Sequence, residues 1–175
     1  MFQCFYPNKY LDSTYQIDFK KEYENGIRGV IFDVDNTLVP HGAPADERSL
    51  ALFEKLREIG IRSLLLSNNK EPRVKSFAEE VGSLYIYKAG KPSPNNYKKA
   101  MERLETDENS TLFVGDQLFT DVWGANRAGI RSYLVKPIHP KEEIQIVLKR
   151  YLEKIVLFFY KRQLKKQEGE DGRAE

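Results

Sequence analysis

Residues 29–38 read GVIFDVDNTL, and this stretch decides how the rest of the chain is interpreted. An apolar run, Gly29–Phe32, is followed by two acids one residue apart, Asp33 and Asp35, and then by a small hydroxyl residue, Thr37. Apolar runs without alternation are typical of strands that are covered on both faces, as in parallel sheets. Because the carboxyl ends of such strands face the ligand crevice, the two acids are predicted to lie at a functional site.

Similar apolar runs recur along the chain and alternate with stretches that have helical patterning. The further predicted strands are Ser63–Leu66, Leu84–Tyr87, Thr111–Val114 and Arg131–Val135. The predicted helices span 46–59, 72–81, 94–105 and 121–128. Successive βα units of this kind predict an α/β fold, with a doubly wound, Rossmann-like parallel sheet and helices on both faces.

The chain is expected to have four parts. They are an aromatic-rich N-terminal segment at 1–26, the α/β core at 27–140, a basic amphipathic helix at 141–167 and a disordered tail at 168–175. From Lys149 to Lys166 the helix carries seven cations against one acid, Glu153, together with large apolar residues. Such a helix either lies in an anionic membrane interface or packs on its own domain or a partner. Both interpretations stay open at this point.

Composition narrows the class of protein. A length of 175 residues suits one domain, and a net charge of +2 argues against a nucleic-acid partner. The single cysteine excludes an internal disulfide framework. The longest apolar run, Ile155–Tyr160, is too short to cross a bilayer. We expect a cytoplasmic protein, with peripheral attachment to the inner face of the membrane left open, and the oligomeric state stays unknown.

Polar groups also follow the other predicted strands. Ser67-Asn68-Asn69 follows the second, Lys91 lies in the turn after the third, and Asp116 follows the fourth, with Asp121 shortly after it. The Ser67 hydroxyl is suited to a phosphate oxygen, and the Lys91 ammonium to negative charge. Asp116 and Asp33 together offer hard oxygen ligands for Mg²⁺.

An aspartate at a strand tip can attack phosphorus when a divalent cation neutralises the charge between the two groups. Asp33 is therefore the candidate nucleophile, and Asp35 the candidate general acid/base toward the leaving oxygen. Each residue also has a simpler interpretation, such as a turn or helix-cap residue for Ser67, a helix N-cap or first-turn acid for Asp121 and a solvated surface residue for Lys91. His41 is interpreted as an ordinary loop histidine.

This ordered set of motifs resembles the haloacid dehalogenase (HAD) superfamily, and Asp-x-Asp-x-Thr resembles its phosphatase branches. The resemblance implies a magnesium site at Asp33, the Asp35 backbone carbonyl and Asp116. It implies Asp121 as either a further ligand or an anchor for water and Lys91. The substrate would be bound by Thr37, Ser67, Asn68 and Lys91.

HAD enzymes usually carry a cap domain after the first or second motif, and the spacing here leaves room for neither, so a capless core with an open site is expected. Over nearly its full length the chain looks like the YqeG-like group (subfamily IIIA), which is similar to mitochondrial phosphatidylglycerophosphate phosphatases. This implies hydrolysis of a phosphorylated lipid head group at or near an anionic membrane surface. The alternatives are a phosphatase of soluble phosphometabolites, nucleotides or phosphoproteins, and a non-catalytic HAD-fold adaptor.

Overall fold

The computed structural model describes residues 2–139 and 144–171, and the side chains of 2–139 and 151–166. Its centre is a six-stranded sheet in the order β1-β6-β5-β2-β3-β4, in which every strand pairing is parallel. The strands are β1 Lys9–Leu11, β2 Gly29–Phe32, β3 Arg62–Leu66, β4 Leu84–Ile86, β5 Thr111–Gly115 and β6 Arg131–Val135. The predicted α/β class and parallel sheet are therefore confirmed.

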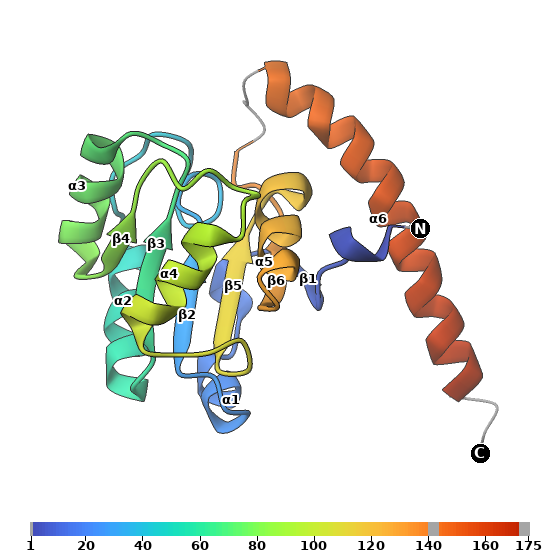
Figure 1. Ribbon diagram of the computed structural model, residues 1–175, viewed down its shortest axis with the longest axis horizontal. Coiled ribbons are helices and arrows are strands. Elements are labelled where there is room, and N and C mark those ends of the chain that lie inside the picture. The colour runs from blue at the N-terminus through green and yellow to red at the C-terminus, as the bar shows by residue number, and fades with distance from the viewer. Residues whose placement is uncertain (1, 140–143, 172–175) are drawn as a thin grey trace.

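Helices cover both faces of this sheet (Figure 1). They are α1 Phe19–Glu24, α2 Glu47–Ile59, α3 Glu71–Val81, α4 Asn95–Leu104, α5 Trp123–Arg127 and α6 Ile144–Asp171, with short turns η1 Gln3–Phe5, η2 Thr14–Gln16 and η3 Leu118–Val122. Side chains of α1, α2 and α3 share one buried apolar cluster with the sheet, and those of α4 and α5 share another. β2 lies between these layers, which explains why all four of its residues are buried.

The start of α2 shows how local sequence sets an element boundary. The Asp46 carboxylate accepts a hydrogen bond from the Ser49 backbone N–H, and the Ser49 hydroxyl oxygen accepts one from the Asp46 N–H. This capping box satisfies two donors that would otherwise lack a partner at the helix start. Gly60 ends the helix at a φ of 91°, a left-handed conformation that glycine adopts without steric cost.

The predicted helix at 121–128 is present, but its first two residues belong to a different type of helix. The chain forms a π-helical turn, η3, over Leu118–Val122, and only then the short helix α5. π-Helical turns are uncommon and occur often at functional sites. Here the turn brings the Asp121 carboxylate back over the end of β5, where the Gln117 backbone N–H donates to it at 3.0 Å.

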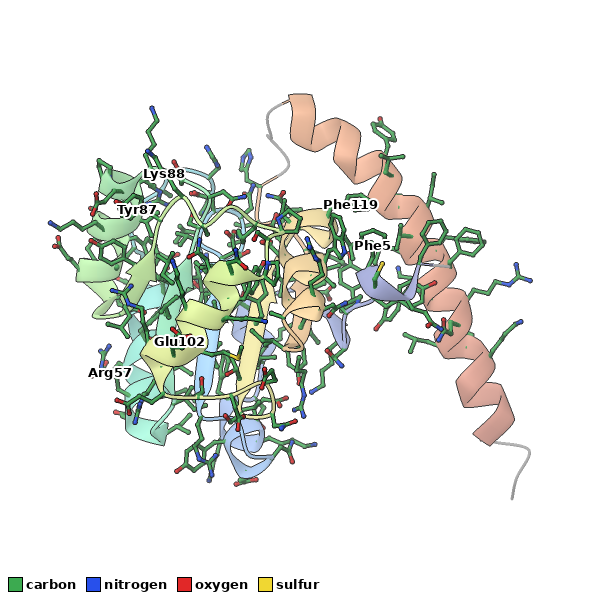
Figure 2. The ribbon with its side chains drawn as sticks, in the orientation of Figure 1. Phe5, Arg57, Tyr87, Lys88, Glu102 and Phe119 are labelled. Atoms are coloured by element: carbon green, nitrogen blue, oxygen red, sulfur yellow. The ribbon has the colours of Figure 1, made fainter. Side chains whose placement is uncertain are left out.

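The N-terminal segment, to which the sequence assigns no regular structure, adds the edge strand β1 beside β6. Together with η3 it also forms the surface on which α6 lies, at the β1 edge of the sheet (Figure 1). Phe5 and Phe119 meet here edge to face, with ring centroids 5.2 Å apart, and both are labelled in Figure 2. The α6 residue Val156 is buried in the same apolar cluster.

Helix α6 continues to Asp171, four residues past its expected end at 167, so the first part of the predicted disordered tail is helical. Residues 141–143 of the expected helix and 172–175 of the expected tail lie outside the described residues. Within the residues that the structure covers, no helix combines the length and the apolar character that crossing a membrane requires.

Candidate active site

The site forms where three neighbouring strands end. Asp33 follows β2, Ser67 follows β3 and Asp116 follows β5, and these strands are adjacent in the sheet. The backbone pairing continues past the strand ends, since the Asp33 N–H donates to the Val114 carbonyl at 2.9 Å and the Ser67 N–H to the Ile86 carbonyl at 3.0 Å. The positions of Asp33 and Ser67 are therefore set by backbone pairing with the neighbouring strands.

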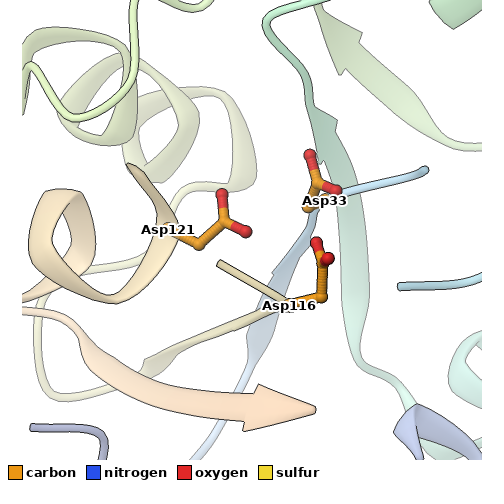
Figure 3. A group of neighbouring side chains, drawn as sticks. All are labelled: Asp33, Asp116 and Asp121. Carbon is orange, nitrogen blue, oxygen red and sulfur yellow. The ribbon is translucent and has the colours of Figure 1, made fainter. Parts of the chain in front are cut away.

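Three buried carboxylates meet at this edge (Figure 3). Asp33, Asp116 and Asp121 each offer an oxygen, and these oxygens all lie within 4.8 Å of one another. The Lys91 ammonium lies 2.6 Å from Asp33 Oδ1 and 2.6 Å from Asp121 Oδ1. With these four groups ionised, the three carboxylates carry three negative charges and Lys91 carries one positive charge. A hard divalent cation fits both this charge and this all-oxygen donor set.

The protonation of the nucleophile candidate depends on this charge balance. Burial raises the pKa of Asp33 to about 7, even though the Lys91 ammonium acts to lower it. Burial acts to lower the pKa of Lys91, but the charges of Asp121 and Asp33 outweigh it and raise that pKa overall. Lys91 is therefore a cation at neutral pH, and one more nearby positive charge would keep Asp33 ionised there as well.

Asp35 lies at the rim of the site and is held by three donors. Its Oδ1 accepts from the Gly42 backbone N–H at 2.8 Å and from Arg73 Nη2 at 2.9 Å, and its Oδ2 accepts from Asn69 Nδ2 at 3.2 Å. Burial acts to raise the pKa of Asp35, but the bonds from Gly42 and Arg73 outweigh it, and the pKa lies below its usual value. The side chain is thus an anion paired with Arg73.

Arg73 was not predicted as a site residue, and Asn69 was named only as part of the polar run Ser67-Asn68-Asn69. A usable signal exists in the sequence, because both lie near the start of the helix that follows the strand ending before Ser67. In a βα unit that first turn lies at the same sheet edge as the functional strand ends. What the sequence could not show is that Arg73 would pair with Asp35, 38 positions away.

Asp121 has both oxygens engaged within the protein. Oδ1 accepts from Lys91, and Oδ2 accepts from the Gln117 backbone N–H. Its close approach to β5 requires Gly115, because a Cβ at that position would lie 2.5 Å from Asp121 Oδ2. These contacts suit the role of an anchor for Lys91, one of the two roles that the resemblance allows.

The other predicted substrate contacts fall at different depths. Asn68 makes two hydrogen bonds to the backbone of Lys91. Its Oδ1 accepts from the Lys91 N–H at 2.8 Å, and its Nδ2 donates to the Lys91 carbonyl at 3.3 Å. Thr37 is buried beneath the pocket, where its hydroxyl lies 3.4 Å from Asp33 Oδ2 and 3.3 Å from Asp116 Oδ1. It contacts carboxylates, which differs from the substrate contact expected for it. Ser67 lines the pocket directly.

Above the carboxylates is a pocket of about 300 Å³. It is lined by residues from all four predicted motifs and by some that the sequence did not single out: Asp33, Asp35, Asn36, His41, Ser67, Asn68, Asn69, Lys91, Gln117 and Thr120. His41, interpreted from sequence as an ordinary loop residue, is part of this lining. Five predicted site residues thus line one pocket: Asp33, Asp35, Ser67, Asn68 and Lys91. The other three, Thr37, Asp116 and Asp121, are not part of this lining but lie beside Asp33 or Lys91.

Comparison with known proteins agrees with this geometry. A family model described as HAD-hydrolase-like matches residues 88–143. The Bacillus subtilis protein named Probable phosphatase YqeG is 36% identical over 159 residues, which cover 90% of this chain and 92% of that protein. This chain belongs to the YqeG-like group of HAD phosphatases.

Two further proteins are more distant from this HAD phosphatase. The Arabidopsis thaliana phosphatidylglycerophosphate phosphatase 1 (chloroplastic/mitochondrial) is 28% identical, over 86% of this chain but only 45% of its own length. The cobalt-bound deoxy-D-mannose-octulosonate 8-phosphate phosphatase of Haemophilus influenzae aligns with a TM-score of 0.52 and 18% identity, over 65% of this chain and 69% of that one. At this sequence identity, the structural similarity shows a shared fold and nothing further.

Proposed function

We propose that this phosphatase hydrolyses phosphate monoesters through an aspartyl-phosphate formed on Asp33. The observation that carries the proposal is the position of Asp33, buried at the floor of a polar pocket with Lys91 Nζ 2.6 Å from its carboxylate. Asp33 attacks phosphorus, the bond to the leaving oxygen breaks, and Asp35 gives that oxygen a proton. Asp35 then takes a proton from the water that hydrolyses the aspartyl-phosphate.

The surrounding residues have separate tasks in this scheme. The Ser67 hydroxyl donates a hydrogen bond to a phosphoryl oxygen, and the Lys91 ammonium offsets the negative charge shared between Asp33 and the phosphoryl group. Asn68 and Asp121 hold Lys91 by its backbone and by its ammonium. To donate a proton, Asp35 must first leave Arg73 and take up a proton from solvent. A substrate that draws Arg73 toward its own anionic group would raise the pKa of Asp35 and so allow this protonation.

Asp33, Asp116 and the backbone carbonyl of Asp35 are the proposed holders of Mg²⁺, with Asp121 beside them. The ion would supply the positive charge that lets two anions, the carboxylate and the phosphate, approach each other. Mg²⁺ prefers oxygen ligands, and the cluster of Asp33, Asp116 and Asp121 offers only carboxylate oxygens.

For the substrate we propose phosphatidylglycerophosphate, which would be converted to phosphatidylglycerol at the surface of an anionic membrane. The support is the match to the Arabidopsis phosphatidylglycerophosphate phosphatase and the absence of room in the sequence for a cap domain. A phosphatase of soluble metabolites, nucleotides or phosphoproteins is the second candidate, because the same chemistry serves any phosphate monoester.

The test is phosphate release from phosphatidylglycerophosphate in detergent micelles with Mg²⁺, beside glycerol 3-phosphate and a nucleotide monophosphate. The lipid should be hydrolysed with the highest kcat/KM. Asp33→Asn should lose essentially all turnover on every substrate, because an amide cannot form the acyl phosphate. Asp107→Asn is the matched control, since that side chain is exposed and precedes β5, at the opposite edge of the sheet from the strand ends that form the site. Turnover above a few per cent in Asp33→Asn would contradict the mechanism, and a preference for soluble esters would contradict the lipid substrate.

A further inference from the structure

Helix α6 presents two different faces along its described side chains. One face packs on the domain, where Val156 and Tyr160 are 4% and 7% exposed and the buried Glu153 carboxylate accepts from the Leu118 backbone N–H at 2.8 Å. The sequence left open whether this helix packs on its own domain, and for this face it does. The inference below therefore concerns the opposite face.

The opposite face is apolar and exposed. Its side chains are 42–63% exposed and comprise Tyr151, Leu152, Ile155, Phe158 and Phe159. Phe159, the least exposed of them, lies at the border of this face and also contacts the Phe2 ring, with centroids 5.8 Å apart. On a helix that advances about 100° per residue, these five fall within an arc of about 120°. Of the nine large apolar residues that are exposed in the described part of the chain, six lie on α6. Such a concentration of apolar surface at one place indicates an interaction site.

The charges around this face have one sign. The cations of residues 151–166 are all exposed: Lys154, Lys161, Arg162, Lys165 and Lys166. The single acid of that stretch, Glu153, is buried on the domain side. A second copy of the chain docked through the same face would bring these cations together with like charges. An anionic surface is complementary to them.

We propose that this face of α6, the α6 outer face, binds an anionic lipid bilayer. Its aromatic and aliphatic side chains enter the interface, and the flanking lysines and arginine contact lipid phosphates. The inference rests on the proposed function in one respect, because a bilayer would hold the proposed lipid substrate. Because α6 packs directly on η3, which carries Asp121, the attached helix and the catalytic pocket belong to one packed unit.

Binding is tested by co-sedimentation with vesicles that contain no phosphate monoester, either phosphatidylglycerol with phosphatidylcholine or phosphatidylcholine alone. Wild type should bind the anionic vesicles at least about tenfold more tightly. An apolar-face variant, Ile155→Gln with Phe158→Gln, and a charge variant, Arg162→Glu with Lys166→Glu, should each lose at least about tenfold. The matched control is Leu50→Gln, which changes a leucine of α2 that is 42% exposed, and it should bind as wild type does.

Hydrolysis of a small soluble phosphate ester should be equal in all four proteins, which shows that each variant is folded. Equal binding to both vesicle types, or binding that neither α6 variant reduces, would overturn the inference. So would a wild-type dimer in light scattering that the apolar-face variant turns into a monomer, because a second copy would then cover the face. If the enzyme binds vesicles but does not hydrolyse phosphatidylglycerophosphate, only the proposed lipid substrate is contradicted. If it hydrolyses that lipid but does not bind vesicles, only this inference is contradicted.

Discussion

Replacing Lys91 by methionine should destabilise the metal-free protein far more than an ordinary lysine substitution. The Lys91 side chain is 4% exposed, and its ammonium lies 2.6 Å from carboxylate oxygens of both Asp33 and Asp121. Removing one partner of a buried ion pair costs about 3–5 kcal/mol, because the remaining charge has neither partner nor water. Methionine has nearly the same length, so the change removes the charge and leaves little cavity.

The size of this loss should depend on pH in a defined direction. The pKa of Asp33 is about 7 with the ammonium present and should rise further without it. A carboxyl whose pKa is higher in the folded state than in the unfolded state makes the protein less stable as pH rises between those two values. The variant should therefore lie about 3–5 kcal/mol below wild type at pH 8, and closer to wild type at pH 5.

The measurement is urea unfolding in EDTA at both pH values, followed by circular dichroism. Lys75→Met is the matched control, since Lys75 is 53% exposed and pairs with Glu79 on the surface of α3 at 3.7 Å. Such a pair contributes about 0.3–0.5 kcal/mol, so the control should stay within that range. A loss below about 1 kcal/mol for Lys91→Met at pH 8, or an equal loss at both pH values, would refute this reasoning.

Three further predictions concern other parts of the molecule. Glu22 is buried and accepts from the Tyr133 hydroxyl at 2.7 Å and the Lys9 ammonium at 2.9 Å, which lower its pKa against the effect of burial. The stability that the ionised Glu22 contributes is present above its unfolded pKa and is lost as pH falls through its folded pKa. Glu22→Gln should therefore lower the free energy of unfolding in urea by about 1.5–3 kcal/mol at pH 7, and the difference from wild type should close below about pH 4. A difference that stays constant with pH would contradict this. Glu153→Leu leaves the buried Leu118 N–H without its acceptor and should lower the free energy of unfolding by about 1–3 kcal/mol in a thermal unfolding experiment. Glu153→Gln keeps an acceptor and should lower it less. Equal losses in the two variants would argue against that hydrogen bond. Mg²⁺ at a hundred times its dissociation constant should raise the free energy of unfolding by about 2.7 kcal/mol over the EDTA-treated protein, and an unchanged urea midpoint would speak against the metal site.

The sequence alone was enough for the central strands and for the residues at their ends. An uninterrupted apolar run such as Gly29–Phe32 is a local pattern, and parallel strands place their carboxyl ends at one edge whatever the details of packing. Asp33, Ser67, Lys91 and Asp116 could therefore be expected near one another before any coordinates were known. Their proximity follows from the order of the elements.

Contacts between segments far apart in the chain were decided only by the tertiary structure. β1 is three residues long and exists through its pairing with β6, so no local pattern marks it. The π-helical turn η3 forms where Asp121 bends back to Gln117 and Lys91. The pairing of Arg73 with Asp35 joins the first turn of α3 to the loop after β2.

Helix α6 shows the same division most clearly. Apolar residues occur on two of its sides, with Val156 and Tyr160 on one and Ile155 and Phe158 on the other. A pattern that is apolar on both sides predicts a helix but does not say which side is covered. Only the packing of the N-terminal segment and η3 against one side determined which apolar surface is buried and which is left exposed.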